Sequence, residues 1–239
     1  MTAPSRHVAI FNLGFRIFFF AGATWAVLMV GLWLSLYAYG MPWPNTFAPA
    51  QWHGREMLFG FAGAIITGFL LTAPGNWTGA RMPSGGKLAA FFLLWLAGRV
   101  VTFAPGWIPR PWMMAVDAAF FPALAIYLYL LLMRYRMVRN LFFPLLLLAM
   151  GAANALTYGG YRNAGGQVIG TELMLGLVVL VIAIMGGRVI PGFTHGRFPQ
   201  GATRDRPRIN LAAMVLLIAA LAAEVAAAPS DRKSTPLNS

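Results

Sequence analysis

The segment QWHGREMLFG, residues 51–60, combines side chains that bind metals with side chains that carry charge. His53 and Met57 are four residues apart, so a helix places the imidazole and the thioether one turn apart on one face. Copper accepts both donors, and haem iron accepts histidine alone or with methionine. His53 and Met57 are therefore candidate metal ligands; an interfacial histidine and a packing methionine are the alternatives. Arg55 and Glu56, between them, can form a surface ion pair of small energetic value.

The sequence around this segment is typical of a membrane protein. It is 59% hydrophobic and 10% charged, whereas soluble domains carry about 25% charged residues. A helix needs about 20 apolar residues to cross a bilayer. Windows that qualify lie at residues 15–39, 53–73, 87–104, 112–133, 141–158, 168–187 and 210–228. The sequence therefore predicts an all-α, polytopic transmembrane helix bundle of about seven spans, in a single domain over residues 1–230.

The basic residues indicate how the bundle is oriented. The formal net charge is +12, which in a soluble protein would point to nucleic acid. Twelve of the 18 lysines and arginines fall on the side of the N-terminus, four on the other side and two in the C-terminal tail. This bias is a positive-inside signal, so we expect a cytoplasmic N-terminus, a lipid bilayer as the environment and no nucleic-acid partner.

Given this orientation, ionisable residues gather near the outer surface. Charged groups inside a bilayer are costly and usually face the protein interior or a cavity. We expect Glu56, Arg99, Asp117 and Glu172 to form a shared pocket there, with His53 on its wall. Mutual neutralisation of Arg99 and Asp117, for structural reasons alone, is the alternative. Glu224 is expected at the same level of the bundle.

Other features of the chain restrict the chemistry. The chain has no cysteine, which excludes thiolate metal sites and cysteine nucleophiles. It has no phosphate loop, no H-E-x-x-H motif and no nucleophile elbow. Of the other two histidines, His7 is expected in the N-terminal tail and His195 in a cytoplasmic loop after Pro191. The second span carries a stripe of polar and small residues at helical spacing: His53, Glu56, Met57, Gly60, Ala64 and Thr67.

The last nine residues, DRKSTPLNS at 231–239, resemble a translated sequencing adapter. We therefore expect a non-native tail there and a native chain that is cut near residue 230. An ordinary polar C-terminal tail is the alternative.

Several longer stretches resemble the NnrS family in order and spacing, from Phe15 to Thr194. They are FRIFFFAGATWAVL, WHGREMLFGFAGAIITGFLLTAPGNWTG, LWLAGRV, GYRN and GRVIPGFT. The resemblance implies a polytopic bacterial inner-membrane protein that binds haem and copper. It also implies a role in nitric oxide metabolism, denitrification and resistance to nitrosative stress, with nitric oxide as the small-molecule partner. The spans of this chain then correspond to the N-terminal part of the family's bundle.

The family's motif in the second span reads H-x-H-E-M. His53, Glu56 and Met57 match it, whereas Arg55 stands in place of the second histidine. A guanidinium stays protonated and cannot ligate a metal, so position 55 has no ligand role here. The resemblance implies that His53 is the haem or metal ligand and that Glu56 orients it or a neighbouring arginine.

The resemblance also implies partners for the haem propionates, namely Arg99 and Arg162, because a guanidinium binds a carboxylate through two hydrogen bonds. Two other functions fit the outer polar layer: a transporter with an outward-facing substrate vestibule, and a purely structural subunit. Transporters usually bind their substrates near the bilayer midplane, so the position of the charges favours the haem–copper hypothesis.

Overall fold

The computed structural model describes residues 9–41, 43, 45–161, 165–197 and 207–227. All regular structure in these residues is helical. The α-helices are α1 (Gly14–Tyr39), α2 (Pro49–Arg55), α3 (Gly63–Leu70), α4 (Ala73–Thr78), α5 (Gly86–Val100), α6 (Arg110–Ala118), α7 (Phe120–Arg134), α8 (Phe142–Thr157), α9 (Gly165–Arg197) and α10 (Pro207–Ala227). Shorter helical segments are η1 (Ala9–Asn12), η2 (Glu56–Ala62), η3 (Val101–Phe103), η4 (Val138–Asn140) and η5 (Tyr158–Tyr161).

Six helical stretches are long and apolar enough to cross a membrane, which confirms the polytopic all-α prediction. They are Gly14–Tyr39, Pro49–Thr78, Gly86–Phe103, Arg110–Arg134, Val138–Thr157 and Ile169–Gly187. The seventh expected span corresponds to α10, whose apolar part in the described chain is the shorter stretch Ala212–Ala223. The protein is therefore a multi-pass membrane protein.

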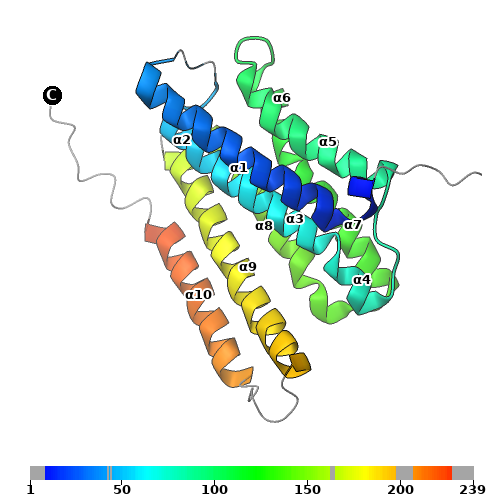
Figure 1. The fold of residues 1–239 in the computed structure, drawn as a ribbon. Helices are drawn as coiled ribbons and strands as arrows, with labels where there is room; N and C mark the ends of the chain where they lie inside the picture. Colours follow the sequence, from blue (N-terminus) through cyan, green and yellow to red (C-terminus); the bar gives the residue numbers. More distant parts are fainter. Residues whose placement is uncertain (1–8, 42, 44, 162–164, 198–206, 228–239) are drawn as a thin grey trace, which may run out of the picture.

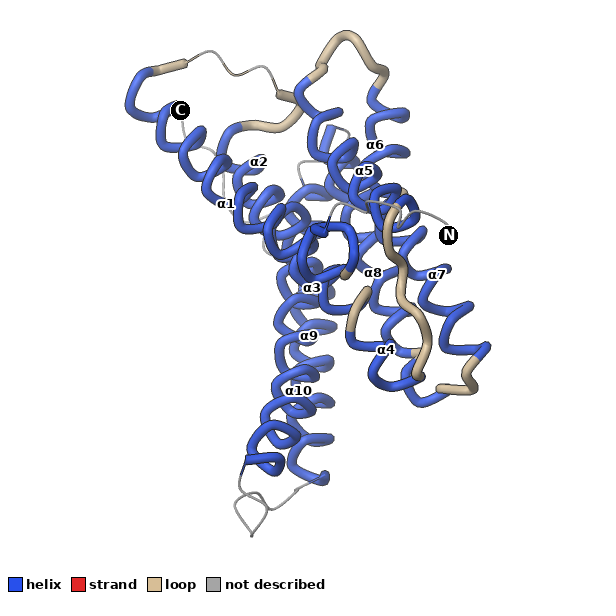
Figure 2. The backbone as a smooth tube through the Cα atoms, turned by 45° about the vertical axis from the view of Figure 1, so that its right-hand side comes forward, coloured by secondary structure: helices blue, strands red, loops and turns tan. Residues whose placement is uncertain are grey.

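The spans pack as an irregular bundle (Figure 1). α1 packs along α3, α7 along α8, and α8 along α9. α9 and α10 form an antiparallel pair that extends beyond the other helices at one end of the bundle (Figures 1 and 2). The main core joins these helices through residues such as Phe18, Phe59, Phe121 and Leu147. Large apolar side chains also cover the outer faces of the helices, as expected of a surface in contact with lipid.

The second span is continuous but not a regular α-helix. Between α2 and α3 lies η2, a π-helix in which the Gly63 N–H donates to the carbonyl of Leu58, five residues earlier. Such π segments inside α-helices are rare and frequently occur at functional sites. The predicted stripe assumed regular α spacing through this region, and η2 changes that spacing. Gly60, Ala64 and Thr67 are nevertheless buried, as the stripe requires.

Another prediction about local structure is wrong. α9 continues through Pro191 to Arg197, so His195 lies in a helix and not in a loop. A proline removes one hydrogen bond from a helix and bends it without always ending it. His7, Arg162 and the expected tail at residues 231–239 lie outside the described residues.

Candidate functional site

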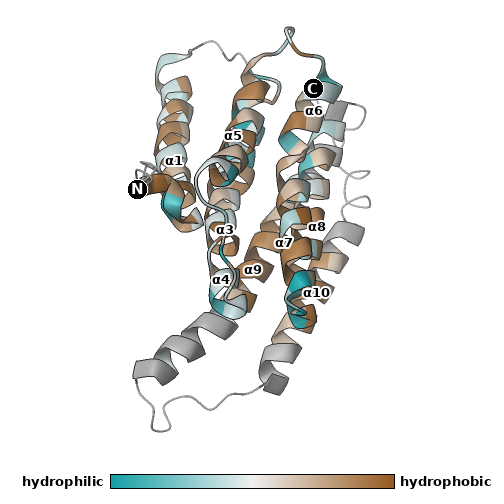
Figure 3. Cartoon of the chain, turned by 90° about the vertical axis from the view of Figure 1, so that its right-hand side faces the viewer, coloured by the Kyte–Doolittle hydropathy of each residue, from teal (hydrophilic) through white to brown (hydrophobic). Residues whose placement is uncertain are grey.

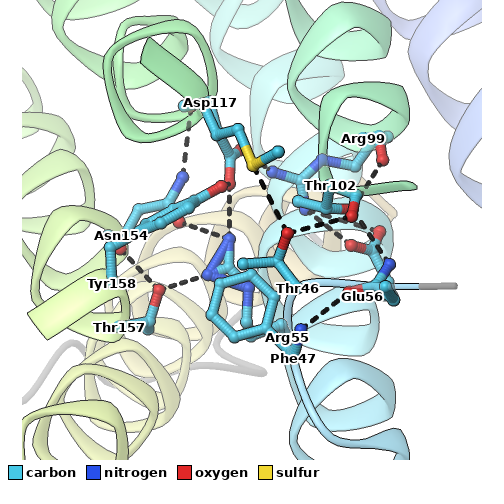
Figure 4. A network of polar contacts seen from close by, with 12 residues as sticks. Thr46, Phe47, Arg55, Glu56, Arg99, Thr102, Asp117, Asn154, Thr157 and Tyr158 are labelled. Atoms are coloured by element: carbon cyan, nitrogen blue, oxygen red, sulfur yellow. Dashed lines mark hydrogen bonds and ion pairs between the residues drawn. The ribbon is translucent and has the colours of Figure 1, made fainter. Parts of the chain in front are cut away.

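Four charged side chains from three of the spans meet inside the bundle (Figure 4). Arg55 (α2), Glu56 (η2), Arg99 (α5) and Asp117 (α6) have exposed fractions of 1%, 0%, 3% and 1%. Asp117 accepts from Arg55 Nη2 through Oδ2 and from Arg99 Nη2 through Oδ1. Arg99 Nη1 lies 3.4 Å from both carboxylate oxygens of Glu56. The structure therefore brings Glu56, Arg99 and Asp117 together as predicted, in a closed network of balanced charge where an open pocket was expected.

Helix α8 and Tyr158, the first residue of η5, contribute neutral partners that the sequence interpretation missed. Asn154 Oδ1 accepts from Arg55 Nη2 at 2.9 Å, and Thr157 Oγ1 accepts from Arg55 Nη1. The hydroxyl of Tyr158 donates to Asp117 Oδ2 at 2.9 Å, and Asn154 Nδ2 donates to the backbone carbonyl of Asp117 at 3.1 Å. Asn154, Thr157 and Tyr158 share one helical face. A polar stripe in the otherwise apolar fifth span was the available signal.

Aromatic rings enclose the Arg55 guanidinium. Its central carbon lies 4.0 Å from the ring centre of Phe47, 4.9 Å from that of Tyr158 and 5.5 Å from that of Phe59. Such cation–π contacts strengthen when water is excluded. The surface-ion-pair alternative for Arg55 and Glu56 is therefore wrong: both side chains are buried, and Arg55 pairs with the carboxylate of another helix.

Two glycines make room for the two carboxylates. A Cβ atom on Gly98 would lie 2.8 Å from Asp117 Oδ1, and one on Gly60 would lie 2.9 Å from Glu56 Oε2. The Gly60 position would also place a Cβ 2.8 Å from the indole of Trp25. That indole Nε1 donates to Glu56 Oε2 at 2.7 Å. The close approach of helices α1, α5 and α6 to the network thus depends on residues without side chains.

The imidazole of His53 makes its ring contact elsewhere, with helix α1. It stacks on the indole of Trp33, with ring centres 4.2 Å apart and an interplanar angle of 16°. His53 Nδ1 is buried and has no hydrogen-bond partner in the described chain. Met57 is half-buried and packs against an apolar cluster that includes Met29 and Trp52. A place for His53 on the wall of the charged site stays a prediction.

Two other expected members are not part of the network. Glu172, in the first turns of α9, is half-buried and forms no hydrogen bond or ion pair with a described residue. The side chain of Glu224 lies outside what the structure describes. α9 packs against η2, so Glu172 lies on a neighbouring element without joining the four charges.

His53 and Met57 are the side chains in this part of the second span that could hold a cofactor. Within the described ranges, no group of three or more His, Asp or Glu side chains is close enough to hold a metal ion. His53 has a buried ring nitrogen free of any partner, and Met57 is the nearby thioether. An imidazole and a thioether are donors that both haem iron and copper accept.

Comparison with known proteins identifies one family. The family model described as NnrS protein matches residues 9–237, nearly the whole chain. Searches among curated proteins and among solved structures found no match. The chain belongs to the NnrS family.

Proposed function

We propose that this protein binds haem and copper in the bacterial inner membrane and acts in nitric oxide metabolism or resistance to nitrosative stress. The observation that carries the proposal is the family match over nearly the whole of a multi-pass membrane chain. Nitric oxide is small and apolar, so a binding protein inside the bilayer meets it where it partitions. Haem iron, when bound, supplies a coordination site for a diatomic ligand.

His53 is the residue that we propose as the haem or copper ligand, with Met57 as a further donor. Its Nδ1 atom is buried without a partner, and an unpartnered buried nitrogen is costly unless a ligand satisfies it. The stacked indole of Trp33 fixes the plane of the ring. A histidine that binds a metal is usually oriented by a hydrogen bond from its second ring nitrogen. In the proposed site, the stacking contact with Trp33 would orient the imidazole of His53.

Neighbouring residues complete the proposed site. Glu56 is held by Trp25 and Arg99, so it fixes the helix one turn after His53. Arg99 and Arg162 are the proposed partners of the haem propionates. Both Nη groups of Arg99 bond to Glu56 and Asp117, and its buried Nε has no partner. That Nε–H is the donor that a propionate contact would use.

Haem content and metal content test this proposal directly. The full chain, purified from haem-producing bacteria, should show a Soret band that shifts on addition of nitric oxide, and its copper is measured by mass spectrometry. His53→Ala should remove most of the Soret absorbance, whereas His195→Ala, the matched loss of one imidazole, should retain it. A wild-type protein without a Soret band contradicts haem binding. Equal spectra for wild type and His53→Ala would assign the ligand to another residue.

A recess at the outer end favours the transporter alternative. It has a volume of about 550 Å³ and is lined by residues that include Asn45, Thr46, Arg110 and Met113. Phe47, 2% exposed, follows Thr46 and covers Arg55, so the buried charges do not open into the recess. Proteoliposomes distinguish the two functions: nitrite uptake that depends on the protein and is lost in Thr46→Trp supports transport. A Soret band without any uptake supports the haem proposal.

A further inference from the structure

An apolar groove runs between α7 and α8 on the outside of the bundle. Its volume is about 370 Å³, its lining is wholly apolar, and Ile126, Tyr129, Leu145 and Leu148 are among the residues that line it. Ile126 is 59% exposed and Leu145 is 67% exposed, so the groove faces lipid. α7 and α8 are coloured largely as hydrophobic along their length (Figure 3). The shape and chemistry of this groove suit a hydrocarbon chain.

Three arginines lie where α7 connects to α8. Arg134 ends α7, and Arg136 and Arg139 follow in the connection; all three are exposed. None of them forms a hydrogen bond or ion pair with a described residue. The groove reaches this connection at Leu141, two residues after Arg139. The positive-inside distribution puts the connection on the cytoplasmic side, at the level of lipid headgroups.

The backbone at Arg136 gives a second, independent indication. The end of α7 is a Schellman turn: the Arg136 N–H donates to Met133 O at 3.1 Å and the Met137 N–H donates to Leu132 O at 2.9 Å. Arg136 occupies its left-handed position, with φ of 55°. Glycine is the favoured residue at that position because a Cβ is strained there.

Other helices in this chain follow that rule. α1 and α4 end on left-handed glycines, Gly40 with φ of 59° and Gly79 with φ of 69°. The turn after α7 therefore does not explain why an arginine stands at position 136. Strained residues of this kind concentrate at ligand sites.

We propose that the α7–α8 hairpin binds an anionic phospholipid of the cytoplasmic leaflet, with an acyl chain in the groove and its phosphate against Arg134, Arg136 and Arg139. Guanidinium groups bind phosphate oxygens through paired hydrogen bonds. Basic residues beside an apolar cleft on the cytoplasmic side are the known chemistry of such sites. Positive-inside topology alone accounts for basic loops in general, but not for a groove that ends at them or for a strained arginine.

Lipid titration of the delipidated full chain, followed by native mass spectrometry, tests the proposal. Phosphatidylglycerol should bind at least tenfold more tightly than phosphatidylcholine with the same acyl chains. Each arginine near the bilayer surface contributes roughly fivefold, so the triple variant Arg134→Gln, Arg136→Gln, Arg139→Gln should lose more than tenfold. Ile126→Trp, which fills the groove, should weaken the binding of both lipids.

Two single variants separate binding from folding. Arg136→Gly keeps the turn and relieves its strain, so the protein should unfold at the same or a higher temperature while its affinity for phosphatidylglycerol falls roughly fivefold. Arg81→Gln removes an exposed arginine that lies outside the α7–α8 connection in sequence, and binding should be unchanged. The proposal is overturned by equal binding of the two lipids, by a triple variant that binds like wild type, or by an equal loss in Arg81→Gln. Concentration-dependent dimers lost in Ile126→Trp would instead assign the groove to a second copy of the chain.

Discussion

The second span presents two neighbouring faces that differ in how their polar atoms are satisfied. On one face, Arg55 bonds through both Nη atoms to Asp117, Asn154 and Thr157 and is closed off from solvent, with its Nε unbonded. On the other face, His53 is half-buried, stacks on one ring and leaves Nδ1 without a partner.

This contrast separates two uses of buried polarity. A network of balanced charge in a low dielectric, in which all four Nη atoms of the two arginines are bonded, is rigid, and removal of Asp117 takes a charged partner from both guanidinium groups. A buried ring nitrogen without a partner contributes nothing to that rigidity and is available to a ligand. The Arg55 face therefore holds the helices together, and the His53 face carries the proposed ligand.

Asp117→Asn should produce the largest effect, because Asp117 is the acceptor for both arginines. Loss of one partner from a buried ion pair costs about 3–5 kcal/mol of unfolding free energy. Thermal unfolding of the purified protein in detergent measures it. Glu172→Gln is the matched control, since it removes a carboxylate that pairs with no described residue and should cost less than about 0.5 kcal/mol. Equal effects of the two substitutions would show that the network does not stabilise the bundle.

Gly98→Ala tests the packing of the same face. The new Cβ would lie 2.8 Å from Asp117 Oδ1 and 3.0 Å from Asp117 Cα, so α5 and α6 must separate. Overpacking of this kind costs about 1–3 kcal/mol. Gly31→Ala in α1 is the control, because no atom lies within 4 Å of its added Cβ and alanine favours the helix by up to about 1 kcal/mol. Opposite signs for the two variants are expected in the same unfolding measurement.

The sequence was sufficient for the spans and for the level of the charges. Six of the expected windows match helices that can cross a membrane. A run of about 20 apolar residues with few charges is the length that a helix needs to span a bilayer, so such runs identify spans reliably. The order and direction of the spans predict that Glu56, Arg99 and Asp117 lie at the same depth in the bundle. In the structure Arg99 bonds to both carboxylates.

The pairing within that level could not be predicted, because it depends on how the helices rotate. Arg55 and Glu56 are adjacent in sequence, yet they point to different helices and pair with Asp117 and Arg99. The π-helix at Glu56–Ala62 changes the spacing of side chains along this span, and hydropathy carries no sign of it. The contribution of α8 is different, because the spacing of Asn154 and Thr157 in an otherwise apolar span indicates a shared polar face.

Tyr158→Phe should have a smaller effect than Asp117→Asn. It removes one neutral donor to the charged Asp117 and leaves the two guanidinium partners in place, at a cost of about 1.5–3 kcal/mol. Burial raises the pKa of the Tyr158 hydroxyl above its ordinary value, so the proton, and with it the stabilisation, is retained below about pH 10 and lost only at higher pH. Unfolding measured at pH 6 and pH 8 should therefore give the same difference. Tyr135→Phe, at an exposed position, should be neutral within about 0.5 kcal/mol.

His53→Ala should have the smallest effect on stability and the largest effect on binding. The substitution removes one stacked contact with Trp33, and an aromatic pair contributes about 0.5–1.5 kcal/mol; because the ring is half-buried, the lower end of that range applies. Parallel measurement of unfolding temperature and Soret absorbance should show a protein that folds like wild type but lacks haem. A destabilisation as large as that of Asp117→Asn would mean that His53 is part of the structural network after all, and the distinction between the two faces would be lost.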